Sequence, residues 1–171
     1  MHALVVYESM FGNTEEVARA ISDGMSSHMS VTAVEVGHAP SAVPLAVDLL
    51  VVGGPTHAFS MSRESTRKDA IAKTPEPLVS QGAGIREWID GLKRDPGLLA
   101  ATFDTKVSKP SLPGSAAAKA AKHLAKTAHA SVLEHQTFWV GGMTGPLADG
   151  ELDRARDWGK ELAIRAEALA D

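Results

Sequence analysis

The stretch from Leu4 to Ala18, L-V-V-Y-E-S-M-F-G-N-T-E-E-V-A, decides the fold class of this 171-residue chain. Around its start, Ala3 to Val6 is a short apolar run rich in β-branched residues, as in a strand buried on both faces. From Asn13 or Thr14 onward the period changes, because apolar residues recur every four positions at Val17, Ile21 and Met25. The stretch therefore predicts a strand, a tight turn and a helix.

The turn reads Ser9-Met10-Phe11-Gly12-Asn13-Thr14. It combines short hydroxyl and amide side chains with a glycine, at the point where a strand leads into a helix. Backbone N–H groups and the positive end of a helix dipole make such a turn suitable for holding a phosphate. The alternative is that Ser9 and Asn13 only cap the helix.

Other phosphate-binding turns do not fit these residues. Gly12 stands alone, so the G-x-G-x-x-G dinucleotide fingerprint is absent. A Walker loop needs a lysine, and none occurs before Lys68. A phosphoacceptor receiver domain needs paired acids after the first strand and an aspartate after the third, but the chain has Glu8 alone and then Gly53-Gly54.

The composition indicates one ordinary globular domain, spanning residues 1–171. Hydrophobic residues make up 44% of the chain and charged residues 22%. No apolar run is long enough to span a membrane, and no signal peptide is recognisable, so we expect a cytoplasmic protein without membrane insertion. The chain has no cysteine, which excludes disulfides and thiolate chemistry. A net charge of -4 argues against nucleic-acid binding.

Strand-like and helix-like patterns alternate along the rest of the chain. Strands are expected at Val31 to Val36, Leu45 to Val52, Leu98 to Phe103 and Val132 to Val140, with Gln136 in a position suited to a bulge. Helices are expected around the apolar stripe of Ile85, Trp88, Ile89 and Leu92, after a Ser115 cap, and from Glu151 with Leu152, Ala155, Trp158, Leu162 and Leu169 buried.

This alternation predicts an α/β fold with a doubly wound, five-stranded parallel sheet of order 2-1-3-4-5 and helices on both faces. In such a sheet, ligands bind at the carboxyl ends of the central strands. Three loops should therefore converge on one site: Glu8 to Asn13, Gly53 to Ser62 and Asp104 to Pro113.

The turn S-M-F-G-N-T resembles the FMN-phosphate loop of the flavodoxin superfamily, whose pattern is S/T-x-T/F-G-x-T. The segment Gly53-Gly54-Pro55-Thr56-His57-Ala58-Phe59 resembles the G-x-P-T segment that runs past the flavin in flavodoxin-like quinone reductases and in the flavodoxin modules of flavodiiron proteins. The resemblance implies a flavodoxin-like protein with FMN as cofactor. It implies a site made of Ser9, Met10, Phe11, Gly12, Asn13, Thr14, Pro55, Thr56, His57, Ala58, Phe59, Asp104, Thr105 and Lys106.

The chain departs from flavodoxins in its aromatic residues. Flavodoxins usually hold the ring between a tryptophan and a tyrosine, but Tyr7 is the only tyrosine here and belongs to the first strand. Phe59 is the better stacking candidate and His57 the second. Trp139 is expected in the core or at the rim. We therefore expect the flavin ring to be more exposed than in an electron-shuttle flavodoxin.

A second departure is an extension, Met61 to Ala83, whose middle from Glu64 to Lys73 can form a short helix. Charge-rich insertions are usually solvated surface excursions, but this one leaves the flavin-side loop and could cover the ring or receive a partner. Cations on this extension and on the third loop predict a positive rim around the flavin, at Arg63, Arg67, Lys106 and Lys109.

Other candidates have structural interpretations. The seven histidines form no metal-binding motif, and no G-x-S-x-G elbow is present. Glu8 is expected to point away from a phosphate. Gly141-Gly142 and Gly145-Pro146-Leu147 are expected only to turn the chain into the last helix. No catalytic residue is assigned, because a flavin carries the electron chemistry itself.

Two functions remain open. The first is FMN-dependent electron transfer, either as a carrier that meets a redox partner protein or as an NAD(P)H-dependent reductase of quinone-like small molecules. The second is a flavodoxin-fold binding or regulatory module with weak or no FMN binding. The sequence leaves the oligomeric state open.

Overall fold

The computed structural model describes residues 1–170, and Asp171, which the expected domain includes, lies outside the described residues. Five parallel strands form one sheet of order β2-β1-β3-β4-β5, which confirms the predicted topology. The strands are β1 (His2–Tyr7), β2 (Ser30–Glu35), β3 (Leu49–Pro55), β4 (Leu99–Val107) and β5 (Ser131–Val140). The helices are α1 (Asn13–Met25), α2 (Glu64–Ile71), α3 (Ile85–Asp90), α4 (Ala116–Thr127) and α5 (Glu151–Ala170), with a 3₁₀ turn at Val36–His38.

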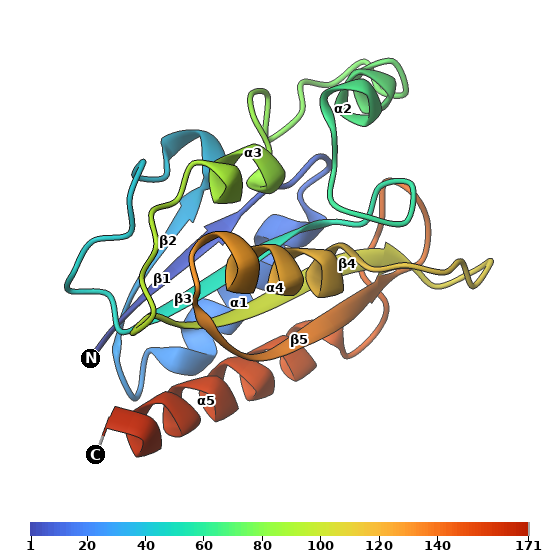
Figure 1. The fold of residues 1–171 in the computed structure, drawn as a ribbon. Coiled ribbons are helices and arrows are strands. Elements are labelled where there is room, and N and C mark those ends of the chain that lie inside the picture. Colours follow the sequence, from blue (N-terminus) through green and yellow to red (C-terminus); the bar gives the residue numbers. More distant parts are fainter. Residues whose placement is uncertain (171) are drawn as a thin grey trace.

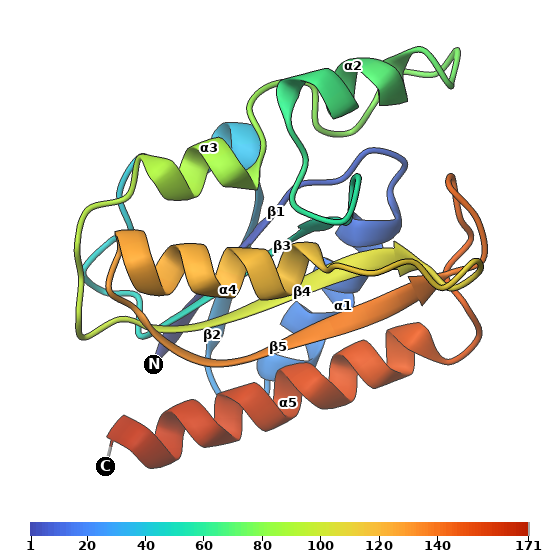
Figure 2. The same ribbon diagram turned by 45° about the vertical axis from the view of Figure 1, so that its right-hand side comes forward.

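Helices cover both faces of the sheet (Figure 1). Figure 2 shows α1 and α5 on one face and α3 and α4 on the other. Alternate residues of β1 enter the two cores, because successive side chains of a strand point to opposite faces: Val5 packs with α1 and α5, and Val6 packs with α3 and α4. The β1–α1 element that the opening stretch predicts thus lies at the centre of the fold.

The core at the face of α1 and α5 contains an aromatic cluster. Phe103, Phe138 and Trp158 meet edge to face, with ring centroids 6.0–6.4 Å apart. The Phe103 ring lies directly over Gly53, where a Cβ atom would come within 2.1 Å of it. Gly53 therefore serves close packing inside the sheet, beyond any role in the loop that follows.

Two strand boundaries differ from the sequence prediction. Leu45 to Asp48 is not part of β3: Val47 N–H donates to the Pro44 carbonyl in a turn, and the Leu45 side chain is fully exposed. β4 continues to Val107, because Asp104 to Val107 still pair with β5. The third loop therefore begins at Ser108, four residues later than expected from its polarity.

Smaller corrections concern β5 and α5. The bulge in β5 lies at Leu133, between the residues that pair with Ala100 and Ala101, whereas Gln136 pairs regularly with Phe103. Leu169 is exposed on the last turn of α5, while Ala155, Trp158 and Leu162 are buried as expected. Ser115 caps α4 as expected, since its Oγ accepts from Ala118 N–H at 3.1 Å.

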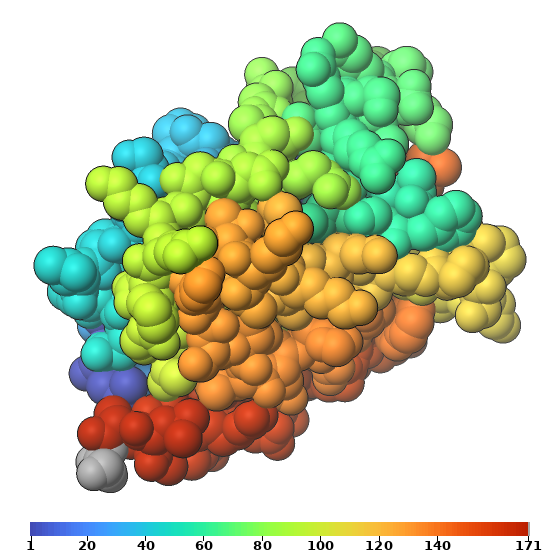
Figure 3. Space-filling model, viewed as in Figure 1, coloured from blue at the N-terminus to red at the C-terminus, as the bar shows by residue number. Residues whose placement is uncertain are grey.

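The insert, residues 61–83, is not a solvated excursion. Six of its residues are buried, and they are Met61, Ser62, Arg67, Ala70, Leu78 and Ser80. In the space-filling view it forms a raised lobe above the loops at the carboxyl ends of the strands (Figure 3). Within residues 1–170, no helix is both long and apolar enough to cross a membrane.

Candidate functional site

The turn between β1 and α1 forms a compact loop around Gly12. Gly12 adopts a left-handed backbone with φ of 94°, and its N–H donates to the Ser9 Oγ at 3.1 Å. Gly12 is also the N-cap of α1, and among residues 1–170 no side chain caps this helix. The alternative that Ser9 and Asn13 serve as helix caps is therefore wrong.

Five N–H groups of this turn donate to no acceptor within residues 1–170; they belong to Met10, Phe11, Asn13, Thr14 and Glu15. Three of them are the first N–H groups of α1, at the positive end of its dipole. A Cβ atom built on Gly12 would meet nothing within 4 Å, so open space lies beside the turn. This arrangement of unpaired donors suits an anion such as a phosphate.

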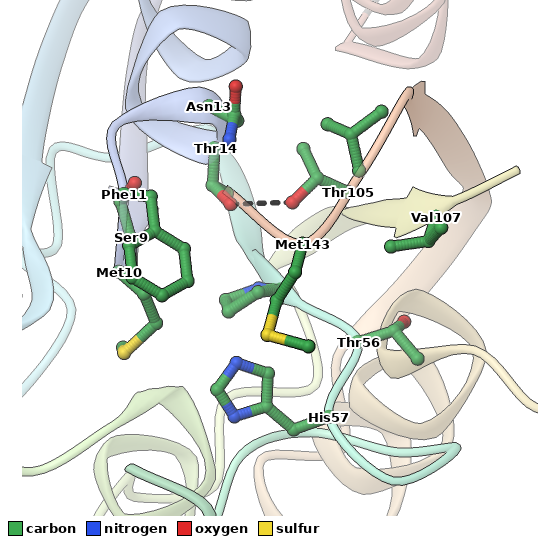
Figure 4. Close-up of a pocket in the computed structure, with 12 residues that line it drawn as sticks. Ser9, Met10, Phe11, Asn13, Thr14, Thr56, His57, Thr105, Val107 and Met143 are labelled. Carbon is green, nitrogen blue, oxygen red and sulfur yellow. Dashed lines mark hydrogen bonds between the residues drawn. The ribbon is translucent and has the colours of Figure 1, made fainter. Parts of the chain in front are cut away.

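A cavity of about 90 Å³, here called the loop chamber, lies against this turn (Figure 4). Nine of the predicted site residues line it: Ser9, Met10, Phe11, Asn13, Thr14, Pro55, Thr56, His57 and Thr105. The Thr14 and Thr105 hydroxyl oxygens lie 2.7 Å apart and join the first loop to β4. The first two predicted loops thus meet the end of β4 at one place.

The second loop turns sharply after Thr56. His57 and Ser60 exchange backbone hydrogen bonds of 2.8 and 3.0 Å, and the two residues between them have positive φ angles, 44° at Ala58 and 69° at Phe59. The Thr56 hydroxyl donates to Asp104 Oδ2 at 2.9 Å and accepts from Ala116 N–H. The hydroxyl is therefore already paired, and the His57 and Ser60 amides are paired with each other's carbonyls, which leaves the Ala58 and Phe59 amides as the donors that this turn can offer.

Asp104 and Lys106 line neither this cavity nor the adjoining one. They alternate along β4 with Thr105 and Val107, which do line the loop chamber, so their side chains point to the opposite face. Asp104 is fully buried and its Oδ2 also accepts from Ser115 Oγ and Ala117 N–H at the start of α4. Lys106 Nζ donates to the carbonyls of Leu112 and Gly114 at 2.5 and 2.7 Å.

A second cavity of about 290 Å³, here called the α2 chamber, adjoins the first. The two share Phe11, Thr56, His57, Val107 and Met143, and the insert adds Thr66, Asp69, Ala70 and Lys73. The α2 chamber alone lies just below the range typical of small-molecule sites, about 300–1,000 Å³. A ligand longer than one chamber would need both.

Met143 lines both chambers. It belongs to the β5–α5 loop, is 58% exposed, and points into the cavity toward His57 (Figure 4). The expectation that this glycine-rich loop only turns the chain is therefore incomplete. The loop follows a fifth parallel strand, and its position at the same sheet edge as the other loops is the signal that would have placed it at the site.

The expected stacking residue is not at the cavity. Phe59 is 49% exposed and lines neither chamber; its carbonyl and Cβ lie against Gly114 of the third loop. Ala58 lines the α2 chamber. Phe11 and His57 line both chambers, and Figure 4 shows their rings facing the same space. The ring surface of the site thus comes from Phe11 of the first loop and from His57, the second stacking candidate, of the second loop.

His57 is neutral over the physiological range. Burial, together with the positive charges of Lys73 and Arg67, lowers the pKa of His57 to about 4. Its Nδ1 lies 3.2 Å from Thr66 Oγ1 at the start of α2. The ring is therefore held between the second loop and the insert without a charge of its own.

Glu8 points away from the cavity, as expected. Its buried carboxylate accepts hydrogen bonds from Ser62 Oγ and from Ile85 N–H at the start of α3. Burial raises the pKa of Glu8, an effect that these two hydrogen bonds oppose. Arg67 donates to Ser62 Oγ at 2.8 Å and pairs with Glu87 at 3.1 Å, so it ties the insert to the core and does not form part of a solvated rim.

No protein-family model and no curated protein sequence matches this chain. Solved structures do match its fold. Oxidised flavodoxin 1 from Bacillus cereus matches with a TM-score of 0.67 at 18% identity, over 96% of this chain and 98% of that one. A flavodoxin from the domain Archaea matches with a TM-score of 0.60 at 19% identity, over 98% and 99% of the two chains.

A longer protein matches as well. The flavodiiron protein from Giardia intestinalis aligns with 98% of this chain at 19% identity and a TM-score of 0.59, and the match spans 36% of that protein. Sheet order, helix placement and these similarities agree on one architecture: the chain has the flavodoxin-like fold.

Proposed function

We propose that this chain binds one FMN non-covalently and uses it for electron transfer. The observation that carries the proposal is the set of five unpaired N–H groups around Gly12, at the start of α1 and beside the loop chamber. A terminal phosphate is an anion of suitable size for such a set of donors. The solved flavodoxins that share the fold support the choice of a flavin.

Most of the residues assigned to FMN would contact the cofactor, each at a part that depends on its position in the site. Ser9 to Thr14 would hold the phosphate, Thr105 would border it across the chamber, and Pro55 to Ala58 would border the flavin. Asp104 would act indirectly, by fixing Thr56 and the start of α4, and Lys106 and Phe59 would not contact the cofactor. FMN is preferred to FAD because the turn neutralises a terminal phosphate.

When bound, FMN would supply the electron chemistry, and this chain would bind it, orient it and control access. The partner would be a redox protein or a small acceptor. The finer proposal is NAD(P)H-dependent reduction of quinone-like acceptors, supported by the space beside His57 and Met143. We place the protein in the cytoplasm and treat residues 1–171 as one domain.

A specific observation supports the alternative of a binding or regulatory module. The loop chamber holds only about 90 Å³, and the Met143 side chain lines both this chamber and the α2 chamber. In that alternative the unpaired N–H groups would bind a smaller anion, and FMN would bind weakly or not at all.

Titration of FMN with the purified, flavin-free protein separates these functions. We expect quenching of flavin fluorescence with a 1:1 end point, and weaker binding of riboflavin, which lacks the phosphate. Absence of quenching at excess FMN would contradict the flavoprotein proposal. If the FMN-bound protein oxidises NADPH in the presence of a quinone, the result supports the reductase function. If it does not, the remaining function is that of an electron carrier.

A further inference from the structure

The insert presents one helical face to the cavity. Thr66, Asp69, Ala70 and Lys73 line the α2 chamber, and their spacing of three, four and seven residues places them on one side of α2 and of the turn that follows it. Figure 2 shows α2 above the loops at the carboxyl ends of the strands, apart from the sheet. Three of these four residues are polar, whereas Phe11, Val107 and Met143 form apolar walls of the same chamber.

Contacts within the protein hold this face in place. Ser80 N–H donates to the Ser9 carbonyl at 2.8 Å, Val79 N–H donates to the Met10 carbonyl at 3.1 Å, and Ser9 N–H donates to Ser80 Oγ. Ala70 belongs to a small buried cluster with Met10 and Leu78. The insert is therefore fixed directly to the phosphate-binding turn, so its position depends on the same loop.

Two charged side chains of this face remain available to a ligand. Within residues 1–170, neither Lys73 nor Asp69 forms a salt bridge, although both line the α2 chamber. Two cations expected at the rim are engaged elsewhere, Arg67 with Glu87 and Lys106 with two carbonyls. His57 is neutral, so Lys73 and Asp69 are the charges of opposite sign that border this chamber.

We infer that the α2 chamber receives the isoalloxazine ring of FMN, and that Lys73 and Asp69 lie at its polar pyrimidine edge. This inference rests on the proposed FMN binding. A flat ring that is apolar at one end and polar at the other fits apolar walls with two charged groups along one side. With the phosphate at Ser9 to Thr14, the ring lies beyond Met143, in the adjoining chamber.

The two charges predict opposite effects on the affinity for reduced FMN relative to oxidised FMN. Two-electron reduction of FMN to the anionic hydroquinone takes up two electrons and one proton, here from dithionite and water, and leaves one negative charge on the pyrimidine part of the ring. Lys73 attracts that charge and Asp69 repels it. Lys73 therefore favours binding of the reduced flavin over the oxidised flavin, and Asp69 disfavours it.

The test compares dissociation constants for oxidised and dithionite-reduced FMN in three variants. Lys73→Met should lower the preference for reduced FMN by about three- to tenfold, the effect of one partly screened charge, and Asp69→Asn should raise it by a similar factor. Lys68→Met is the matched control, because Lys68 is an exposed lysine of the same insert, on α2, and pairs with Glu64 at 2.7 Å. It should leave the ratio unchanged.

The outcomes are distinguishable. Opposite shifts in the Lys73 and Asp69 variants, with near-normal affinity for oxidised FMN, support the inference. An unchanged ratio in both variants overturns it while the proposed function stands. If the wild-type chain binds no FMN, the proposed function itself fails and this inference with it.

Discussion

The hydroxyl oxygens of Thr14 and Thr105 lie 2.7 Å apart, although the two residues are 91 positions apart in the chain. One is in the first turn of α1 and the other is in β4, and both line the loop chamber. Because this pair is buried, removing one hydroxyl leaves the other without its partner.

The first prediction uses this pair. Thr14→Val and Thr105→Val should each destabilise the fold by about 1–3 kcal/mol, the cost of an unpaired buried hydroxyl. The double variant should cost less than the two single effects added, because it leaves no orphaned group. Denaturant unfolding of the four proteins gives the coupling energy, and strict additivity would show that the hydroxyls do not interact. In FMN titrations, Thr14→Val should also weaken binding by ~1–3 kcal/mol.

The second prediction concerns the left-handed residue of the turn. Gly12→Val should abolish FMN binding, because φ of 94° is strained for a β-branched residue and its side chain would project into the open space beside the turn. Gly82→Val is the matched control, since a Cβ atom there also meets nothing within 4 Å and φ is not positive. Fluorescence quenching should be lost in the first variant only; retained binding in Gly12→Val would remove the turn from the phosphate site.

The third prediction concerns Met143, which lines both chambers, as a side chain that limits entry. Met143→Ala should join them into one cleft and raise the FMN association rate constant severalfold, because the passage no longer depends on rotation of a long side chain. Stopped-flow quenching measures this rate. Leu112→Ala, at an exposed residue that lines neither chamber, should leave it unchanged. Equal rates in wild type and Met143→Ala would show that Met143 does not limit entry.

The fourth prediction follows from His57. Its pKa is about 4 when folded and about 6.5 when unfolded, so the unfolded chain binds more protons between these values. Stability should therefore fall as the pH is lowered from about 6.5 to about 4, with no further loss from this residue below that. His57→Gln should remove this part of the acid destabilisation, as measured by urea unfolding at several pH values.

A separate measurement examines the charges around His57. Burial is the main cause of its low pKa, followed by Lys73 and Arg67, while Asp69 borders the same chamber. Lys73→Met should raise the pKa of His57 in an NMR titration without any flavin, and Lys68→Met should not. An unchanged value in the Lys73 variant would place that ammonium away from the chamber.

The sequence by itself determined the central part of the molecule. The change from an apolar β-branched run to a four-residue period around Gly12 predicts β1, the turn and α1, and the observed α1 begins at Asn13 as expected. Alternating strands and helices predict the parallel sheet and its order. These features follow from local periodicity and turn chemistry, which depend on residues close together in the sequence.

Only the tertiary structure decided which side chains meet at the cavity. Asp104 and Lys106 have suitable chemistry for a site, but the alternation of β4 directs them away while Thr105 and Val107 face inward. Met143 reaches the cavity from the β5–α5 loop, whose glycines and proline predicted only a turn into the last helix. The insert packs on the turn around Ser9 and Met10 through Ser80 and Val79, which turns a charge-rich segment into a wall of the site. The alternation in β4 reaches these residues only because β4 pairs with β5 as far as Val107. The placements of Met143 and the insert likewise depend on contacts between segments far apart in the chain, and such contacts leave no periodic signal in the sequence of either segment.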